Sequence, residues 1–177
     1  YRAKAAGRNQ LTFFEVGMQA AAMHRLKLAS DLRRALPDQQ LVLFFQPIVD
    51  LATGSVHKAE ALLRWRRPNA GLVLPGEFVG IAEESGLIHE IGNWVFKSAA
   101  YYARHWSGLL GEQFQISINK SPVQFQHHAT RMDWVAYLRE LDIPANSINV
   151  EITEGLLLNL TDKVFARLSQ LHAGGVE

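Results

Sequence analysis

The sequence contains no cysteine, and this absence removes several kinds of chemistry at once. A chain without cysteine has no disulfide bond, no thiolate zinc site and no cysteine nucleophile. Any metal ion must therefore be held by side chains of Asp, Glu, Asn or His. The lack of disulfides is compatible with a reducing compartment, so we expect a cytoplasmic chain whose parent protein could be anchored to a membrane through other segments.

An excess of charge of either sign is also absent. Lys and Arg together number 18, Asp and Glu number 17, and the formal net charge is +1. This balance gives no electrostatic reason to expect nucleic acid or direct membrane contact. The sequence also lacks an apolar run of about 18 residues that could span a bilayer. Hydrophobic residues make up 48% of the chain, which predicts a globular domain.

Apolar residues follow helical spacing from residue 15 to residue 36, which predicts a long helix that could serve as a stiff connector. Its expected apolar stripe consists of Ala22, Leu26, Ala29, Leu32 and Leu36. Beyond this helix, short strand-like runs alternate with helical segments. This order is typical of α/β units on a parallel sheet.

The strand-like runs begin at residues 41–45, which we expect to form a strand that ends at Gln46-Pro47. Residues 48–51 and 56–65 are expected to form a hairpin. Further strands are expected at 114–119 and 148–153. Helices are expected over residues 77–84, 88–106, 132–141 and 161–172.

Three of the expected strands carry an acidic or amide group on the face opposite their apolar residues. Glu60, Asn119 and Glu151 hold these positions, as the two-residue period of a strand requires. Two carboxylates and an amide are hard oxygen ligands, which suit Mg²⁺ or Mn²⁺ rather than Zn²⁺. Arg64 shares the face of Glu60 and could pair with a phosphate oxygen.

The same residues also have structural interpretations. Glu60 could form an ion pair with Lys58 or Arg64, and periodicity alone favours that interpretation. Asn119 could serve the turn that follows it. Glu151 and Glu154 could lie at a solvated strand end that precedes a helix. His127 and His128 could be two exposed histidines of a loop.

Six short sequence motifs in a fixed order favour the functional interpretation of these residues over the structural one. Together they resemble the EAL family of cyclic-di-GMP phosphodiesterases. A single Glu-Ala-Leu triplet carries no information, whereas six ordered strings between residues 31 and 177 are highly specific. The strings are Gln46-Pro47-Ile48-Val49, Glu60-Ala61-Leu62-Leu63-Arg64-Trp65, Pro75 to Phe78, Ala82-Glu83-Glu84-Ser85-Gly86, Ser117-Ile118-Asn119-Lys120-Ser121 and Glu151-Ile152-Thr153-Glu154.

The resemblance implies a TIM-like barrel whose first strand is antiparallel, and metal-dependent hydrolysis of cyclic-di-GMP to linear pGpG. It implies a two-metal site in the full domain, filled by Mg²⁺ or Mn²⁺. Matched residue by residue, it also implies these roles: Glu60, Asn119 and Glu151 as metal ligands, Gln46, Leu62 and Arg64 as substrate-binding residues, and Glu154 as a support for a catalytic loop.

The opening residues resemble a different family, the GGDEF diguanylate cyclases, at the C-terminal end of their domain. This resemblance implies an upstream GGDEF domain in the same parent chain. We therefore expect a GGDEF remnant at 1–14, a connector helix at 15–36 and the N-terminal part of an EAL-like barrel at 37–177. The chain also lacks an initiator Met, so we expect both of its ends to be cuts.

A full barrel takes roughly 250 residues, so this chain is expected to hold about its first half. By the resemblance, an aspartate pair, a lysine and a later glutamate lie beyond Glu177. We therefore expect the parent protein to be active and the isolated chain to be inactive. An unpaired strand edge favours a homodimer. Alternative functions are a non-catalytic cyclic-di-GMP receptor and a dimerising regulatory module.

Overall fold

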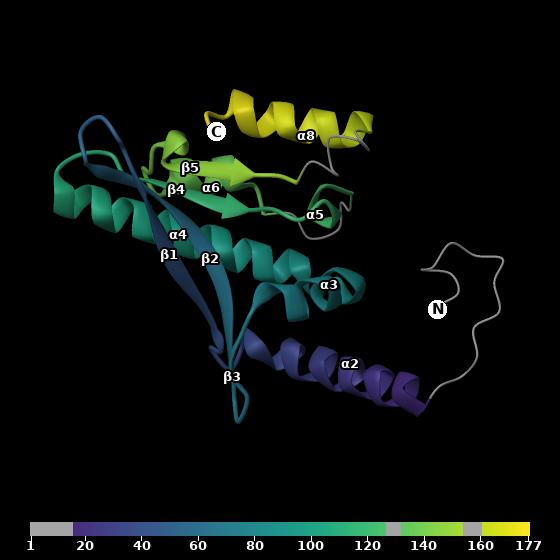
Figure 1. Ribbon diagram of the computed structural model, residues 1–177. Helices are drawn as coiled ribbons and strands as arrows, with labels where there is room; N and C mark the ends of the chain where they lie inside the picture. The colour runs from purple at the N-terminus through teal and green to yellow at the C-terminus, as the bar shows by residue number, and fades with distance from the viewer. Residues whose placement is uncertain (1–15, 127–131, 154–160) are drawn as a thin grey trace.

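A single mixed β-sheet with helices packed along one face forms the centre of the molecule (Figure 1). The computed structural model describes residues 16–126, 132–153 and 161–177. The strands lie in the order β1-β2-β4-β5, and β3 pairs with β2. Helix α4 runs along the back of the sheet, and α2 lies at the end where β2 meets β3.

The five strands combine two directions of pairing. Strand β2 is antiparallel to β1 and β3, whereas β2, β4 and β5 are parallel to one another. An antiparallel first strand beside parallel strands agrees with the sequence expectation, while closure into a barrel stays a prediction. The strands are β1 (Leu41–Val49), β2 (Val56–Arg67), β3 (Gly71–Val73), β4 (Gln115–Asn119) and β5 (Ile148–Glu151).

The helices begin and end at residues that suit their termini. Pro75 opens α3, where its fixed φ and missing N–H cost nothing, and Gly86 ends α3 with φ 77°. Asp133 and Thr161 cap α6 and α8 by accepting backbone N–H bonds. The helices are α2 (Val16–Ala35), α3 (Pro75–Ser85), α4 (Ile88–Leu110), α5 (Val123–Gln126), α6 (Trp134–Glu140), the 3-10 turn η1 (Ala145–Ser147) and α8 (Asp162–Ala173).

The hydrophobic core lies between one face of the sheet and the helices. Ile116, Ile118 and Ile148 point into it from β4 and β5 and are at most 1% exposed. Trp65 of β2 packs edge-on against Phe78 of α3, with ring centroids 5.7 Å apart. Because this face is filled with apolar side chains, the residues at alternate positions lie on the opposite face of the sheet.

Strand β1 corrects one expectation from the sequence. The strand does not end at Gln46-Pro47 but continues to Val49, with Gln46 opposite Glu60 and Pro47 opposite Ala59. Proline is tolerated here because β1 is an edge strand of the sheet that the structure describes, so its missing N–H breaks no second ladder.

Helix α2 corrects another expectation. Its buried face consists of Leu28, Leu32 and Ala35, each at most 3% exposed. Leu26, which was expected in the apolar stripe, is 67% exposed, and Ala22 is exposed as well. None of the helices in the described residues is long and apolar enough to cross a membrane.

Candidate functional site

Glu60, Asn119 and Glu151 come from three strands of the sheet and lie on the same face. Asn119 is the last residue of β4 and lies directly beside Glu151, the last residue of β5. Glu60 lies beside Ser117 of β4, one pleat further back. Neighbouring strands are separated by about 4.8 Å, so the register alone brings Asn119 and Glu151 together.

Hydrogen bonds hold this group in place. The Nδ2 group of Asn119 donates to Oε1 of Glu60 over 2.8 Å. The backbone N–H of Lys120 donates to the carbonyl of Glu151 over 3.0 Å, which extends the ladder between β4 and β5 past Asn119. Glu60 and Glu151 are half-buried and Asn119 is exposed, so the cluster is partly accessible to solvent.

The structure excludes the ion-pair interpretation of Glu60. Four ion pairs occur within the described residues, and none contains Glu60, Lys58 or Arg64. Arg64 instead donates from Nη1 to the carbonyl of Leu63 over 2.8 Å and lies 5.8 Å from the ring of Phe44. Glu60 therefore forms a hydrogen bond with the Asn119 amide of β4 and no ion pair with a basic residue of its own strand.

The three residues expected to bind substrate share the face of Glu60. Gln46 lies directly opposite Glu60 across the β1–β2 ladder, and Leu62 follows Glu60 on the same face. Gln46 is exposed, while Leu62 and Arg64 are half-buried. Phe44 on this face is 43% exposed, so the described residues leave it open to solvent. The substrate-binding roles stay predictions, and Glu154 lies outside the described residues.

A buried polar layer lies beneath the cluster, and sequence reasoning did not identify it. Ser117 is 4% exposed, and its hydroxyl accepts a hydrogen bond from Nδ2 of Asn149 over 2.9 Å. Alternation did place both residues on the polar face, but only the register shows that they pair. This layer supports the strand ends that carry Asn119 and Glu151.

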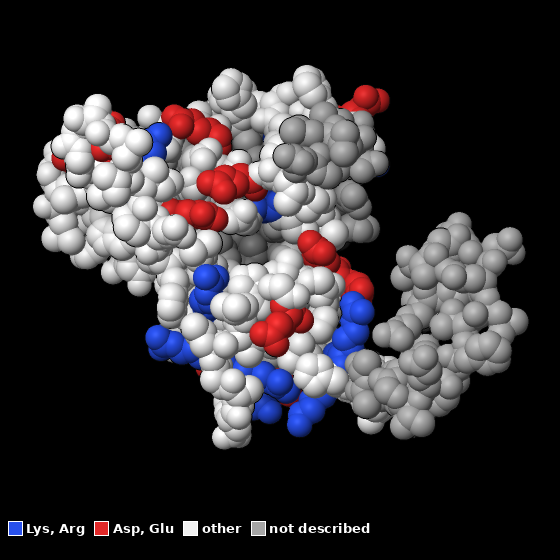
Figure 2. Space-filling model, in the orientation of Figure 1, with Lys and Arg blue, Asp and Glu red and all other residues white. Residues whose placement is uncertain are grey.

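The donor set fits a hard divalent cation. Carboxylate and amide oxygens are the ligands that Mg²⁺ and Mn²⁺ prefer, and the sequence contains no cysteine thiolate that could compete with them. No cluster of three or more His, Asp or Glu side chains placed to hold a metal occurs among residues 16–126, 132–153 and 161–177. The candidate set therefore depends on the amide of Asn119. On the face seen in Figure 2, acidic atoms are grouped over β4 and β5, while basic atoms lie mainly over α2 and the β2–β3 hairpin.

Comparison with protein families agrees with this arrangement. A model of the EAL domain matches residues 29–177, which is most of the chain. The chain belongs to the EAL family. The GGDEF remnant expected at residues 1–14 lies outside the described residues and stays a prediction.

Two curated EAL relatives from Pseudomonas aeruginosa match nearly the whole chain. The bifunctional diguanylate cyclase/cyclic di-GMP phosphodiesterase MucR is 42% identical over 178 residues, covering 99% of this chain and 26% of MucR. The cyclic di-GMP phosphodiesterase NbdA is 35% identical over 177 residues, covering 99% of this chain and 22% of NbdA. The chain thus spans about a quarter of the length of the curated relatives it matches.

Solved EAL structures share the fold. The MucR phosphodiesterase in complex with c-di-GMP superposes with a TM-score of 0.77 at 38% identity, covering 85% of this chain and 61% of that one. The EAL enzyme Bd1971, in a form with cAMP and cyclic-di-GMP bound, gives a TM-score of 0.75 at 29% identity, with 91% and 45% covered.

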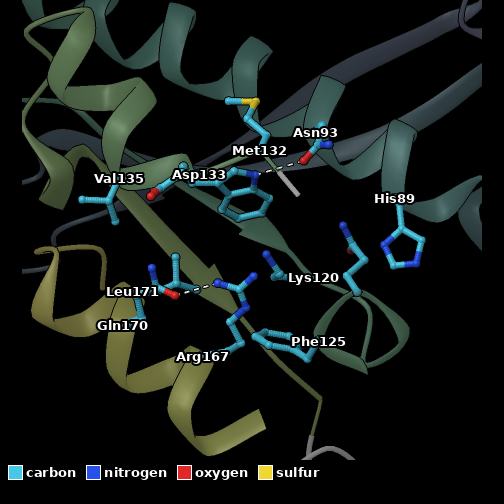
Figure 3. Close-up of a pocket in the computed structure, with 12 residues that line it drawn as sticks. His89, Asn93, Lys120, Phe125, Met132, Asp133, Val135, Arg167, Gln170 and Leu171 are labelled. Atoms are coloured by element: carbon cyan, nitrogen blue, oxygen red, sulfur yellow. Dashed lines mark hydrogen bonds between the residues drawn. The ribbon is translucent and has the colours of Figure 1, made fainter. Parts of the chain in front are cut away.

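A pocket of this EAL chain lies beside the segment that follows β4 (Figure 3). Lys120 extends into it, with Nζ 3.4 Å from the ring centroid of Trp134 and 5.1 Å from that of Phe125. Arg167 of α8 borders the same pocket and donates to Gln170. These two ring contacts of Lys120 are cation–π contacts, in which the ammonium group lies over an aromatic face.

Proposed function

We propose that the protein to which this chain belongs hydrolyses cyclic-di-GMP to linear pGpG, and that this chain supplies one part of the metal site and of the substrate surface. One observation carries the proposal. The Asn119–Glu60 hydrogen bond and the Asn119–Glu151 register bring two carboxylates and an amide together from three strands of an EAL-family sheet. The two carboxylates lie on the strands either side of β4, and the Asn119 amide between them lies on the same open face of the sheet.

Glu60, Asn119 and Glu151 would hold Mg²⁺ or Mn²⁺ through their side-chain oxygens. Bound there, divalent cations supply a nucleophilic water at neutral pH and neutralise charge on the phosphoryl group. The residues of the chain provide position: the ladder between β4 and β5 fixes Asn119 beside Glu151, and the hydrogen bond fixes Glu60 against Asn119.

The substrate surface lies beside these ligands on the open face of β1 and β2. Arg64 supplies a positive charge two residues from Leu62 and four from Glu60, where it can pair with a phosphate oxygen. Gln46 supplies an amide directly opposite Glu60, and Leu62 an apolar contact. Charge, amide and apolar surface together match a cyclic dinucleotide, which carries phosphates and purine bases.

The upstream GGDEF domain is part of the same proposal. The match to MucR, whose name includes a diguanylate cyclase, covers 99% of this chain and so extends into the residues before 29. A relative with both activities supports a parent protein in which a GGDEF domain precedes the helix α2.

The test uses the complete protein with cyclic-di-GMP and Mn²⁺. We expect Glu60→Gln to lower both Mn²⁺ affinity and the rate of hydrolysis by more than about tenfold. Replacing a residue that only orients a metal ligand usually costs about 10–100-fold, so loss of a ligand should cost at least as much. Glu112→Gln is the matched control, since Glu112 is an exposed carboxylate paired with His57 away from the cluster. It should leave both quantities unchanged.

The outcomes separate the candidate functions. Hydrolysis that Glu60→Gln abolishes supports the phosphodiesterase. Binding of cyclic-di-GMP without hydrolysis in the wild type identifies a receptor, and the absence of binding leaves the dimerising module. Full activity of Glu60→Gln would contradict the metal-ligand role. The isolated residues 1–177 form a further arm, in which we expect no hydrolysis.

A further inference from the structure

Two neighbouring glutamates end helix α3, and they point to different parts of the molecule. Oε1 of Glu83 accepts a hydrogen bond from the hydroxyl of Ser121 over 2.7 Å. Oε1 of Glu84 pairs with Nη2 of Arg25 in α2 over 2.6 Å. Glu83 is half-buried, whereas the Glu84 side chain is 67% exposed. Only the first of the two faces the candidate metal site.

Ser121 belongs to the loop that leaves β4 directly after Asn119. Its hydroxyl receives the backbone N–H of Val123 over 3.2 Å while donating to Glu83. Its own N–H donates to Oε1 of Gln124 over 3.0 Å. Ser121 is thus the point at which this loop is tied to a separate helix.

The hydrogen bond between Ser121 and Glu83 is charge-assisted. A hydroxyl that donates to a carboxylate forms a stronger hydrogen bond than one between neutral groups, and 2.7 Å is the upper end of its usual range. The bond spans 38 positions in the sequence, so it joins two elements that no local interaction would hold together. It fixes Ser121 relative to α3, and α3 is fixed to the sheet through Phe78 and Trp65.

Glu83 also borders the space beside the candidate ligands. A hollow of about 400 Å³ is lined by Glu83, Asn119, Ser121 and Glu151 together with apolar residues of α3 and α4. The side chain of Glu83 forms its hydrogen bond with Ser121 and not with Asn119 or Glu151. Its influence on the ligands must therefore pass through the loop.

We propose that Glu83 is a positioning residue: it holds Ser121, and through the loop it fixes the side chain of Asn119 in the orientation needed to bind a metal ion beside Glu151. The role rests on the proposed function, because positioning of a ligand has a consequence only if the site binds a metal. Residues that orient metal ligands usually change affinity or activity by 10–100-fold when they are replaced.

The experiment compares three variants of the complete protein. Glu83→Ala removes the acceptor, Glu83→Gln keeps a neutral acceptor of the same shape, and Glu84→Ala is a control on the adjacent residue. Three readouts are used: amide hydrogen exchange over residues 119–124 without metal, Mn²⁺ affinity by calorimetry, and kcat and KM for cyclic-di-GMP.

We expect Glu83→Ala to accelerate exchange over residues 119–124, to weaken Mn²⁺ binding by about 10–100-fold and to lower kcat more than it raises KM. Glu83→Gln should recover most of each loss, because its side-chain oxygen can still accept from Ser121. Glu84→Ala should behave as the wild type in all three measurements. If Glu83→Ala fails to fold, Ser121→Ala takes its place, since it deletes the donor of the same bond.

Wild-type exchange and Mn²⁺ affinity in Glu83→Ala would overturn the proposal whatever the activity. Equal losses in Glu83→Ala and Glu84→Ala would also overturn it, because they would indicate a general effect of α3. A wild-type protein that neither binds Mn²⁺ nor hydrolyses cyclic-di-GMP refutes the proposed function instead, and the exchange measurement then still reports whether Glu83 orders the loop.

Discussion

Replacing Gly92 by alanine should disturb the loop that carries the candidate site from a position inside helix α4. A Cβ at Gly92 would lie 1.9 Å from Nε2 and 2.8 Å from Cδ of Gln124. Non-bonded heavy atoms rest at about 3.5 Å or more, so the amide would have to move by roughly 1.5 Å. Gln124 is only 9% exposed, and its Oε1 accepts the N–H of Ser121 over 3.0 Å. We expect that movement to break the bond to Ser121, because the buried amide has little room to turn.

The expected change in the free energy of unfolding is the difference between two opposing effects. Leaving the N–H of Ser121 without its partner costs about 1–3 kcal/mol. Alanine in place of glycine within a helix returns about 0.5–1 kcal/mol. Gly92→Ala should therefore lower the free energy of unfolding by about 0–2.5 kcal/mol, with a central value of about 1 kcal/mol. Gly108→Ala in the same helix meets no atom within 4 Å and should gain about 0.5–1 kcal/mol.

Urea denaturation of the two variants and the wild type measures this difference, with thermal melting as a second probe. A change of 1 kcal/mol corresponds to about 2–4 °C in Tm for a chain of this size. Gly92→Ala should also weaken Mn²⁺ binding, since Ser121 follows Asn119 closely, whereas Gly108→Ala should not. Equal stabilisation by the two substitutions would refute the close contact between α4 and Gln124.

Two further predictions concern the buried face of α2 and the β1–β2 turn. Leu32→Ala should cost about 2–5 kcal/mol of unfolding free energy, and Leu26→Ala less than about 0.5 kcal/mol, in urea denaturation; similar losses would contradict the burial of α2. The N–H groups of Thr53 and then Ala52 donate to Asp50 and lower its pKa. The ionised Asp50 therefore stabilises the folded state at pH values above the ordinary carboxyl pKa, and this stabilisation is lost as the pH falls through the lowered pKa of Asp50. Asp50→Asn lacks this group, so it should lose less stability than the wild type between pH 5 and pH 2. Identical pH dependence in denaturation would exclude this role.

The sheet positions of the site could be predicted from the sequence because each strand has one face in the core. Burial of Ile116, Ile118 and Ile148 leaves Asn119 and Glu151 on the other face, whatever the remaining topology. The same reasoning holds for Glu60, since its neighbours Ala59 and Ala61 are both 3% exposed.

Features that depend on distant parts of the chain could not be predicted in this way. Proline normally ends a strand, yet Pro47 continues β1 because only one neighbour pairs with that strand in the described sheet. The face of α2 that is buried is decided by where α3 lies, and α3 begins about 40 residues later in the sequence at Pro75. Leu26 satisfies the helical period and still faces solvent.

Register is the property on which the chemistry of the site depends, and the two-residue period cannot determine it. A slip of two residues between β4 and β5 would keep every apolar side chain in the core, yet it would move Asn119 from Glu151 to Asn149, about 6.6 Å away. The Ser117–Asn149 bond below the cluster and the Lys120–Glu151 backbone bond at its edge fix the observed register. The bond of Ser121 to Glu83 holds the loop that follows β4 against α3. The metal-ligand set is therefore specified less by the ligands than by the hydrogen bonds that surround them, which is why substitutions at residues that touch no ligand are the sharpest tests of the site.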